Sequence, residues 1–410
     1  MKNEGCSKRI LFLFCIFLYP VMFRKLTALS YIYQYGIPLA YIALNFEVVR
    51  KISKKQVFII GGLVILIYLS LLYPTLHGTY DYSYLKVSTF VFRKLLVYVF
   101  LGIVLLKEYG KNMSVEYFIY YYIMVHAIYV CGTLILVLVP GFKTIWFSVF
   151  SEVVETGTLL ESFGYTFRIG WQGFAGYRMT LHCTWCCILL FYMFFECKEQ
   201  YRIKESVFFI LFALCFLGNM FYGRSGLVLS ILIALGAVIL WNKKYFYRIL
   251  QMGCAFVLFA IIIYLLRNKP IVSDWYTWMS KPLINLVTEG TFNNYSVNRI
   301  NEMVFMPEWK TILKGDGMFM ENGHYYMRTD SGFMRNILFW GIGGAFVSYL
   351  ITWISLWDLK RYSWFVCICM IMTFAIFEYK GDVYYEYIAF ALAISFVENF
   401  SIKRDKNGEE

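Results

Sequence analysis

The polar side chains best suited to catalysis lie in one segment, residues 267–331, which includes Arg299, His324, Arg328 and Asp330. A carboxylate such as Asp330 can accept a proton from an attacking hydroxyl group, and a histidine such as His324 can do so near neutral pH. Arginine presents a fixed fork of donors that matches pairs of phosphate oxygens. The segment therefore indicates acid–base chemistry beside a phosphate group.

Each catalytic candidate also has a plainer interpretation. Asp330 stands shortly before an apolar run that begins near Phe333, and an aspartate in such a place commonly caps the N-terminus of a helix. His324 could equally be an ordinary surface histidine. The residue types alone leave both alternatives open.

Two motifs place an arginine at the start of an apolar helix. Arg224 lies in the tight turn YGRSG, where Ser225 is the candidate N-cap, and Arg335 lies about one helical turn inside the run that follows TDSG. A helix N-terminus presents unpaired N–H groups and a partial positive charge, so it favours anions. Snorkelling to lipid headgroups is the alternative for any one arginine. The predicted pyrophosphate ligands are Arg178, Arg224, Arg299, Arg328 and Arg335.

The elements that must position these residues are membrane helices. Hydrophobic residues make up 60% of the chain and charged residues 16%, with a mean hydropathy of +0.60. Apolar runs of about 17 to 25 residues recur, the length that a helix needs to cross a bilayer. The runs are continuous, which excludes the alternating strands of an outer-membrane barrel.

The expected fold is an all-α, polytopic membrane protein, a single domain over residues 1–410. About twelve transmembrane helices are expected, and the first apolar run is a retained span because no convincing signal-peptide cleavage site follows it. The predicted spans are residues 10–23, 29–45, 57–73, 90–106, 116–138, 178–196, 206–221, 226–241, 249–266, 333–355, 364–378 and 384–398.

Charge sets the expected orientation. Lysine and arginine mark every second connector, beginning with Arg50 and Lys51, and positively charged connectors stay in the cytoplasm. Both termini are therefore predicted to be cytoplasmic, with residues 139–177 and 267–331 as outer loops. The larger loop precedes the tenth span and carries apolar residues at helical spacing, so it is expected to be ordered and functional.

The cysteines do not indicate a metal site. Cys183, Cys186 and Cys187 cluster inside an apolar run without a second pair of ligands, and free cysteine packs readily as a small apolar side chain. No metal or other cofactor is expected.

Several of these features together resemble the O-antigen polymerase family of bacterial surface polysaccharide synthesis. They are the GRSG turn at residues 223–226, NRINEMVF at 298–305 with the later Trp309, KGDGMF at 314–319 and TDSGFMRNILFWGIGG at 329–344. The resemblance covers roughly residues 205–355 by pattern and the remainder by the number of spans.

The resemblance implies a membrane glycosyltransferase of the bacterial inner membrane. Such an enzyme joins oligosaccharide repeat units carried on undecaprenyl pyrophosphate at the periplasmic face. It needs neither nucleotide sugar nor metal, because its donor is already activated, and it binds no nucleic acid. Arg224 and Arg335, helped by Arg328 and Arg299, would hold the pyrophosphate, and Asp330 or His324 would be the base. Membrane lipids, a chain-length regulator and a flippase are the implied partners.

Two other functions stay open. An O-antigen ligase also carries a histidine in this outer loop, so His324 is compatible with ligation of the finished polymer. A twelve-span transporter, such as a polysaccharide flippase, commonly shows two related halves and a site between broken helices, but the sequence has no obvious repeat.

Overall fold

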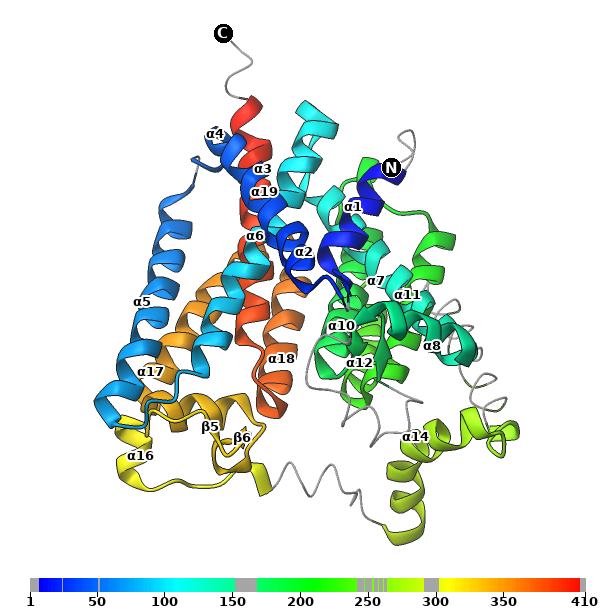
Figure 1. The fold of residues 1–410 in the computed structure, drawn as a ribbon. Helices are drawn as coiled ribbons and strands as arrows, with labels where there is room; N and C mark the ends of the chain where they lie inside the picture. Colours follow the sequence, from blue (N-terminus) through cyan, green and yellow to red (C-terminus); the bar gives the residue numbers. More distant parts are fainter. Residues whose placement is uncertain are drawn as a thin grey trace. The chain divides into compact units, whose positions relative to one another are not determined.

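The computed structural model describes residues 7–405 apart from 24, 51, 152–167, 291–301 and most of 242–263. The chain forms two compact units, Met1–Ile32 with Ile119–Asn294 and Tyr33–Phe118 with Tyr295–Glu410. Nearly all of the described elements are helices, and the strands form three short antiparallel pairs (Figure 1). We call the two parts unit 1 and unit 2 and describe each separately.

Six helices of the described chain are long and apolar enough to cross a membrane. They correspond to six of the predicted spans, so the all-α class and the transmembrane character agree with the sequence. The helical stretches are Lys54–His77, Tyr84–Asn112, Val115–Leu138, Tyr177–Glu196, Glu205–Tyr222 and Gly332–Arg361.

The first predicted span is shorter than expected. Helix α1 covers only Lys8–Leu18, 11 residues, and at about 1.5 Å per residue it rises roughly 16 Å, about half of a bilayer core. It stops because Pro20 disfavours a helical backbone at Tyr19. The chain then forms β1 (Met22–Phe23), which pairs antiparallel with β2 (Phe150–Ser151).

The second predicted span, residues 29–45, is helical but contains a π-helical turn. Its pieces are α2 (Thr27–Tyr31), a π-helical turn (Ile32–Gly36) and α3 (Ile37–Leu44), after which α4 (Phe46–Val49) follows. Pro38 lacks an N–H group, so the hydrogen-bond ladder cannot run unbroken through this stretch. The predicted span 249–266 lies almost wholly outside the described residues.

Three further predicted spans are helices that fall outside the set of six. They are α12 (Arg224–Trp241), α18 (Trp364–Lys380) and α19 (Tyr384–Asp405). Helix α18 has only 17 residues, and α19 carries acidic residues and ends in a charged turn. Whether these helices cross a membrane stays a prediction.

Unit 1 is built around α10 (Tyr177–Phe191), which is almost entirely buried and continues as a π-helical turn (Tyr192–Glu196). Helices α11 (Glu205–Tyr222) and α12 pack on it closely, because Gly223 and Gly226 lie directly against Thr180. Asn219 accepts a hydrogen bond from Thr180 at 2.6 Å and donates one to Ser230 at 2.8 Å, so a polar chain ties the three helices together.

The rest of unit 1 consists of helices and hairpins around this core. Cys183, Cys186 and Cys187 are fully buried in α10. The remaining elements are the greater part of α7 (Val115–Leu138), α8 (Pro140–Val149), the pair β3 (Ile169–Gly170) and β4 (Gly173–Phe174), a 3-10 turn (Glu199–Tyr201) and α14 (Pro270–Glu289).

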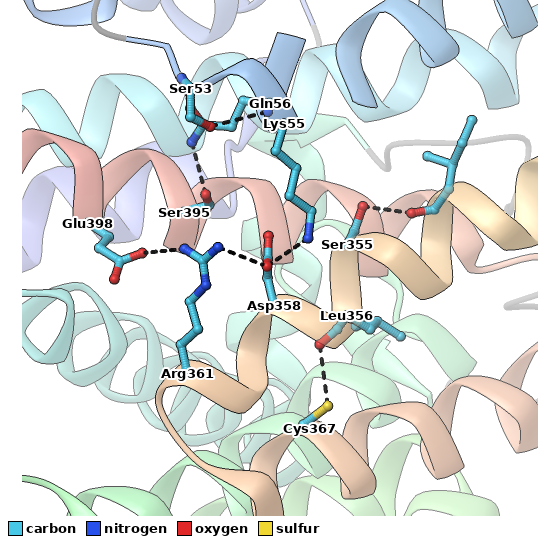
Figure 2. Close-up of polar contacts among 11 residues, drawn as sticks. Ser53, Lys55, Gln56, Ser355, Leu356, Asp358, Arg361, Cys367, Ser395 and Glu398 are labelled. Carbon is cyan, nitrogen blue, oxygen red and sulfur yellow. Dashed lines mark hydrogen bonds and ion pairs between the residues drawn. The ribbon is translucent and has the colours of Figure 1, made fainter. Parts of the chain in front are cut away.

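Unit 2 packs α5 (Lys54–His77), α6 (Tyr84–Tyr109), α17 (Gly332–Trp357), α18 and α19 together. At one end, Lys55 and Arg361 both pair with Asp358, at 2.7 and 3.4 Å, and Gln56 donates to Ser395 at 2.9 Å (Figure 2). These contacts tie the start of α5 to α19 and to the 3-10 turn Asp358–Arg361 that follows α17. The 3-10 turn Gly110–Asn112 follows α6.

The part of the predicted large loop that belongs to unit 2 lies at the other end of that unit. It contains α16 (Trp309–Lys314), the pair β5 (Met320–Glu321) and β6 (His324–Tyr325), and a 3-10 turn (Tyr326–Arg328). The described residues 302–331 thus form short helices and a hairpin, and α14 forms another part of the same predicted loop.

This segment packs against a break in α17. Gly341 has φ 70° and ψ 176°, which interrupts the helix and opens the carbonyl groups of Leu338 and Phe339. The backbone N–H of Asp316 donates to Leu338 at 2.7 Å, and that of Gly317 donates to Phe339 at 3.2 Å. The segment thus supplies the hydrogen bonds that the broken helix lacks, as buried backbone requires.

Only glycine fits on either side of this contact. A Cβ atom on Gly341 would lie 2.6 Å from the carbonyl oxygen of Leu313, and one on Gly315 would lie 2.4 Å from that of Phe339. Both glycines also have positive φ angles, a region that other residues enter at a cost. This contact explains why glycines stand in both KGDG and WGIGG.

We expect Gly341→Ala to lower the free energy of unfolding by at least about 2 kcal/mol, since backbone strain and steric overlap act together. Gly343→Ala is the matched control, because Gly343 lies in the same helix with open space around it, and alanine there should be neutral or slightly stabilising. Thermal unfolding of the two detergent-solubilised variants measures the difference. Equal stability of the two variants would contradict the helix break.

Candidate functional site

The segment that carries the catalytic candidates is fixed to the turn between α5 and α6. One carboxylate oxygen of Asp81 accepts hydrogen bonds from the backbone N–H groups of Phe319 and Met320, both at 2.6 Å. The hydroxyl group of Thr79 donates to the carbonyl oxygen of Gly317 at 2.6 Å. Together with the break in α17, these bonds hold residues 315–320 on two sides.

A tight hairpin follows. Asn322 and Gly323 both have positive φ angles, 49° and 78°, as a two-residue turn between twisted strands requires. The turn pairs Glu321 with His324, and it leaves the imidazole of His324 exposed at the tip. Within the described residues, no hydrogen bond joins His324 to Asp330, so the structure does not bring the two catalytic candidates together.

Asp330 and Arg335 form the centre of the site in unit 2. The Nη2 atom of Arg335 lies 3.2 Å from Oδ1 of Asp330, and its Nε atom donates to the carbonyl oxygen of Thr329 at 3.1 Å. The guanidinium group lies over the ring of Tyr325, 3.1 Å from its centroid. Arg335 is buried, whereas 51% of the Asp330 side chain is exposed. Arg335 therefore orients a carboxylate that faces outward.

The alternative that Asp330 caps α17 is wrong. The helix begins at Gly332, and Ser331 occupies the N-cap position. Asp330 lies one residue too early and pairs instead with Arg335. The hydroxyl group of Thr329 donates to the carbonyl oxygen of Met303 at 2.7 Å, which fixes the backbone just before the carboxylate.

Arg328 takes no part in that contact. Arg328 is exposed and has φ 54°, outside any long helix. Arg299 lies outside the described residues. A role for either in anion binding stays a prediction.

Arg224 belongs to unit 1, where it meets an aromatic side chain of α14. Its Nη1 atom donates to the carbonyl oxygen of Trp278 at 3.0 Å, and its guanidinium group lies 5.0 Å from the centroid of the indole. Arg168 lies over the same indole at 5.4 Å. Because α12 begins at Arg224, Ser225 lies within the first turn, and the expectation that it is the N-cap is wrong.

The two arginines raise the positive potential around Trp278. Burial and the nearby charge of Arg224 lower the pKa of Arg168 to about 10, so both groups stay charged at neutral pH while repelling each other. An anion bound between them would relieve that repulsion. Sequence reasoning did not select Arg168 or Trp278 as ligands, and the contact between Arg224 and Trp278 joins residues 54 positions apart.

Arg178 lies on the first turn of α10 and is exposed. Thr180, two residues later, donates to the carbonyl oxygen of Gly223 at 3.0 Å. The start of α10 therefore lies beside the turn that carries Arg224. Of the predicted pyrophosphate ligands, Arg178 and Arg224 lie in unit 1, whereas Arg328 and Arg335 lie in unit 2.

The sequence analysis missed a buried carboxyl group that contacts the start of α17. Glu378 of α18 accepts hydrogen bonds from the Tyr349 hydroxyl group at 3.1 Å, from Asn336 at 3.3 Å and from the backbone N–H of Val383 at 2.8 Å. Gly332 lies against it so closely that a Cβ atom would be 2.2 Å from its Oε1 atom. Glu378 thus fixes the start of α17, two residues after Asp330.

The missed signal was an acidic residue at the end of an apolar run, which in a membrane protein usually faces a functional interior. Asp382 and Glu386 are buried nearby, and Lys94 lies 3.9 Å from Glu386. Among the described residues, no group of three or more histidine, cysteine or acidic side chains is arranged to hold a metal ion.

Comparisons with family models, curated proteins and solved structures find no match to this chain. Two clusters of side chains therefore provide the only basis for inferring a function from the described residues. One presents a carboxylate held by a buried arginine, and the other presents two arginines on one tryptophan.

Asp81 makes the docking of the segment sensitive to acid. Partial burial raises the pKa of Asp81, but hydrogen bonds from Ser83 and from the N–H groups of Met320 and Phe319 outweigh it and hold the pKa below its ordinary value of 3.8. A carboxyl group with a lowered pKa stabilises the folded state above its unfolded pKa, and this contribution is lost as the pH falls through the folded value.

We therefore expect wild type to be more stable than Asp81→Asn by about 1 to 2 kcal/mol at neutral pH, since hydrogen bonds to a charged acceptor are the stronger ones. The difference should shrink as the pH falls from about 5 to about 3. Thermal unfolding across this range measures it. Glu321→Gln, which changes an exposed carboxylate on the same segment, should show no such trend. A constant difference for Asp81→Asn would contradict the charged docking.

Proposed function

We propose that this chain is a membrane glycosyltransferase that polymerises oligosaccharide repeat units carried on undecaprenyl pyrophosphate, at the periplasmic face of the bacterial inner membrane. The observation that carries the proposal is the exposed carboxylate of Asp330, fixed by buried Arg335 at the start of an apolar helix. It occurs within the TDSG segment, the part of the chain that carries much of the resemblance to O-antigen polymerases.

The proposed reaction uses Asp330 as the general base. A hydroxyl group of the acceptor sugar attacks the anomeric carbon of the donor, whose bond to the pyrophosphate oxygen breaks, and Asp330 accepts the hydroxyl proton. The pyrophosphate leaves with the bonding electron pair and remains on its lipid carrier. The bond energy comes from the donor, so the step needs no cofactor. A positioned base of this kind contributes roughly 10² to 10⁴ in rate.

Arginines would stabilise the charge that develops on the departing pyrophosphate. In unit 1, Arg224 and Arg168 suit this role because they converge on Trp278, where a bound pyrophosphate would offset their mutual repulsion. Arg178 at the neighbouring helix start would assist them in unit 1, whereas Arg328 and Arg299 of the large loop would bind a pyrophosphate within unit 2. Arg335 has a different role, because its Nε and Nη2 atoms are already engaged by Thr329 and Asp330. It would orient the base.

The orientation follows from the basic connectors. Both termini would lie in the cytoplasm, and the loop segment would face the periplasm, where the lipid-linked repeat units are presented. A chain-length regulator and a flippase would be partners of the same system.

One observation favours each alternative function. The ordered hairpin that exposes His324 favours an O-antigen ligase, in which that histidine would serve as the base. The break in α17 favours a transporter, because broken helices commonly form transport sites. In this chain, however, the carbonyl groups of Leu338 and Phe339 already accept hydrogen bonds from Asp316 and Gly317. The carbonyl groups at the break are thus already hydrogen-bonded within the protein.

The surface polysaccharide of a host lacking this gene separates the three functions on a gel that resolves chain length. Loss of all polymer, with a single repeat unit still attached to the lipid core, is the result that the proposal predicts. Polymer that accumulates on the carrier lipid would instead identify a ligase. Loss of even the single repeat unit would identify a flippase.

Complementation of the deletion with two variants tests the base. Asp330→Asn keeps the size and much of the hydrogen bonding of the side chain, so we expect normal protein level in the membrane and at least about 100-fold less polymer. His324→Ala is the comparison on the same segment and should leave the ladder intact. A normal ladder with Asp330→Asn would contradict the assignment, and loss of polymer with His324→Ala alone would transfer it to His324.

A further inference from the structure

Three tryptophans and a lysine gather at the end of unit 2 that is opposite the loop segment. We call Trp353, Trp357, Lys360 and Trp364 the tryptophan–lysine cluster. The rings of Trp353 and Trp357 are stacked with centroids 6.1 Å apart, and Trp364 meets Trp357 edge to face at 5.5 Å. The ammonium group of Lys360 lies 4.5 Å from the centroid of Trp357 and 5.7 Å from that of Trp364.

The three indoles stay largely on the surface of the unit. Their exposed fractions are 49% for Trp353, 37% for Trp357 and 56% for Trp364. The cluster covers the last turns of α17 and the first residue of α18, where two apolar helices end at a basic turn. Tryptophan gathers at such a level in membrane proteins because the indole has an apolar body and one polar N–H group.

The acidic residues around the cluster are engaged by other cations. Asp358 pairs with Lys55 at 2.7 Å and with Arg361 at 3.4 Å, and Arg361 also lies 3.9 Å from Glu398 (Figure 2). Lys360 points instead over the two indoles. Three cations, Lys55, Lys360 and Arg361, thus stand near two acidic side chains, so this surface carries an excess of positive charge.

We propose that the tryptophan–lysine cluster binds one anionic phospholipid. The lipid phosphate would pair with Lys360, and the glycerol and upper acyl chains would lie along Trp357 and Trp364. A cation held on indole faces keeps its charge while losing part of its hydration, which favours an anionic ligand with an apolar portion over a free anion. In the orientation that we predict from the basic connectors, this end lies in the cytoplasmic leaflet, where anionic lipids are abundant.

The test uses the purified full chain in vesicles of phosphatidylcholine with increasing fractions of brominated phosphatidylglycerol, which quenches tryptophan fluorescence on contact. Brominated phosphatidylcholine in the same proportions gives the reference. We expect Lys360→Gln to reduce the preference for the anionic lipid about fivefold, which corresponds to the roughly 1 kcal/mol contributed by one lysine at an anionic surface.

Lys54→Gln is the matched control, because Lys54 is an exposed lysine at the same end of the unit, on the first turn of α5. It should change the preference less than about twofold, since a charge outside the site acts only through screened attraction. An equal effect of both variants would mean diffuse attraction and would overturn the site. An unchanged preference in Lys360→Gln would also overturn it.

Soluble glycerol phosphate provides a second check on the ligand. It carries the phosphate without acyl chains, so it should not displace the brominated lipid at millimolar concentration. Displacement would mean that the cluster recognises a free phosphate, and the assignment to a phospholipid would then be wrong.

Discussion

The structure of unit 2 depends on one backbone constraint, the break of α17 at Gly341. A helix within a membrane protein cannot leave carbonyl groups unsatisfied, because each costs several kilocalories per mole when buried. Here the N–H groups of Asp316 and Gly317 complete the helix, and the chain around them is held further by Asp81. A polar segment that would otherwise be a long loop is thereby attached to the apolar core. Arg335 holds Asp330, and Tyr325 of the attached segment lies against the guanidinium group of that arginine.

Much of the helical architecture could be predicted from sequence, because only a helix satisfies its own backbone over a long apolar run. Lys54–His77 and Glu205–Tyr222 follow the predicted spans closely. The prediction was wrong where a proline competes with that rule, at Pro20, before which α1 has only 11 residues. Gly341, which breaks α17, belongs to the motif TDSGFMRNILFWGIGG that we singled out from sequence. The local sequence does not indicate, however, which segment forms hydrogen bonds with the broken helix.

The candidate site, too, could be predicted only in part from sequence. The pairing of Asp330 with Arg335 is local, five residues apart, and both residues were selected from sequence, although the helix cap proved to be Ser331. Contacts between distant residues could not be foreseen, such as those of Arg224 and Arg168 with Trp278, or that of Asp81 with Phe319. They depend on packing that pairs surfaces far apart in the chain. Glu378 was accessible to reasoning, because an acid in an apolar run is costly unless it is used.

The most direct test of this account is amide hydrogen exchange of the full chain in lipid nanodiscs, read over residues 315–320. If the N–H groups of residues 316, 317, 319 and 320 are hydrogen-bonded to α17 and Asp81, they exchange as slowly as the adjoining helix, and Gly341→Ala accelerates their exchange selectively. Exchange in wild type as fast as that of the exposed hairpin tip at Asn322 would contradict the account, because the segment would then be a free loop and would not hold Tyr325 against Arg335.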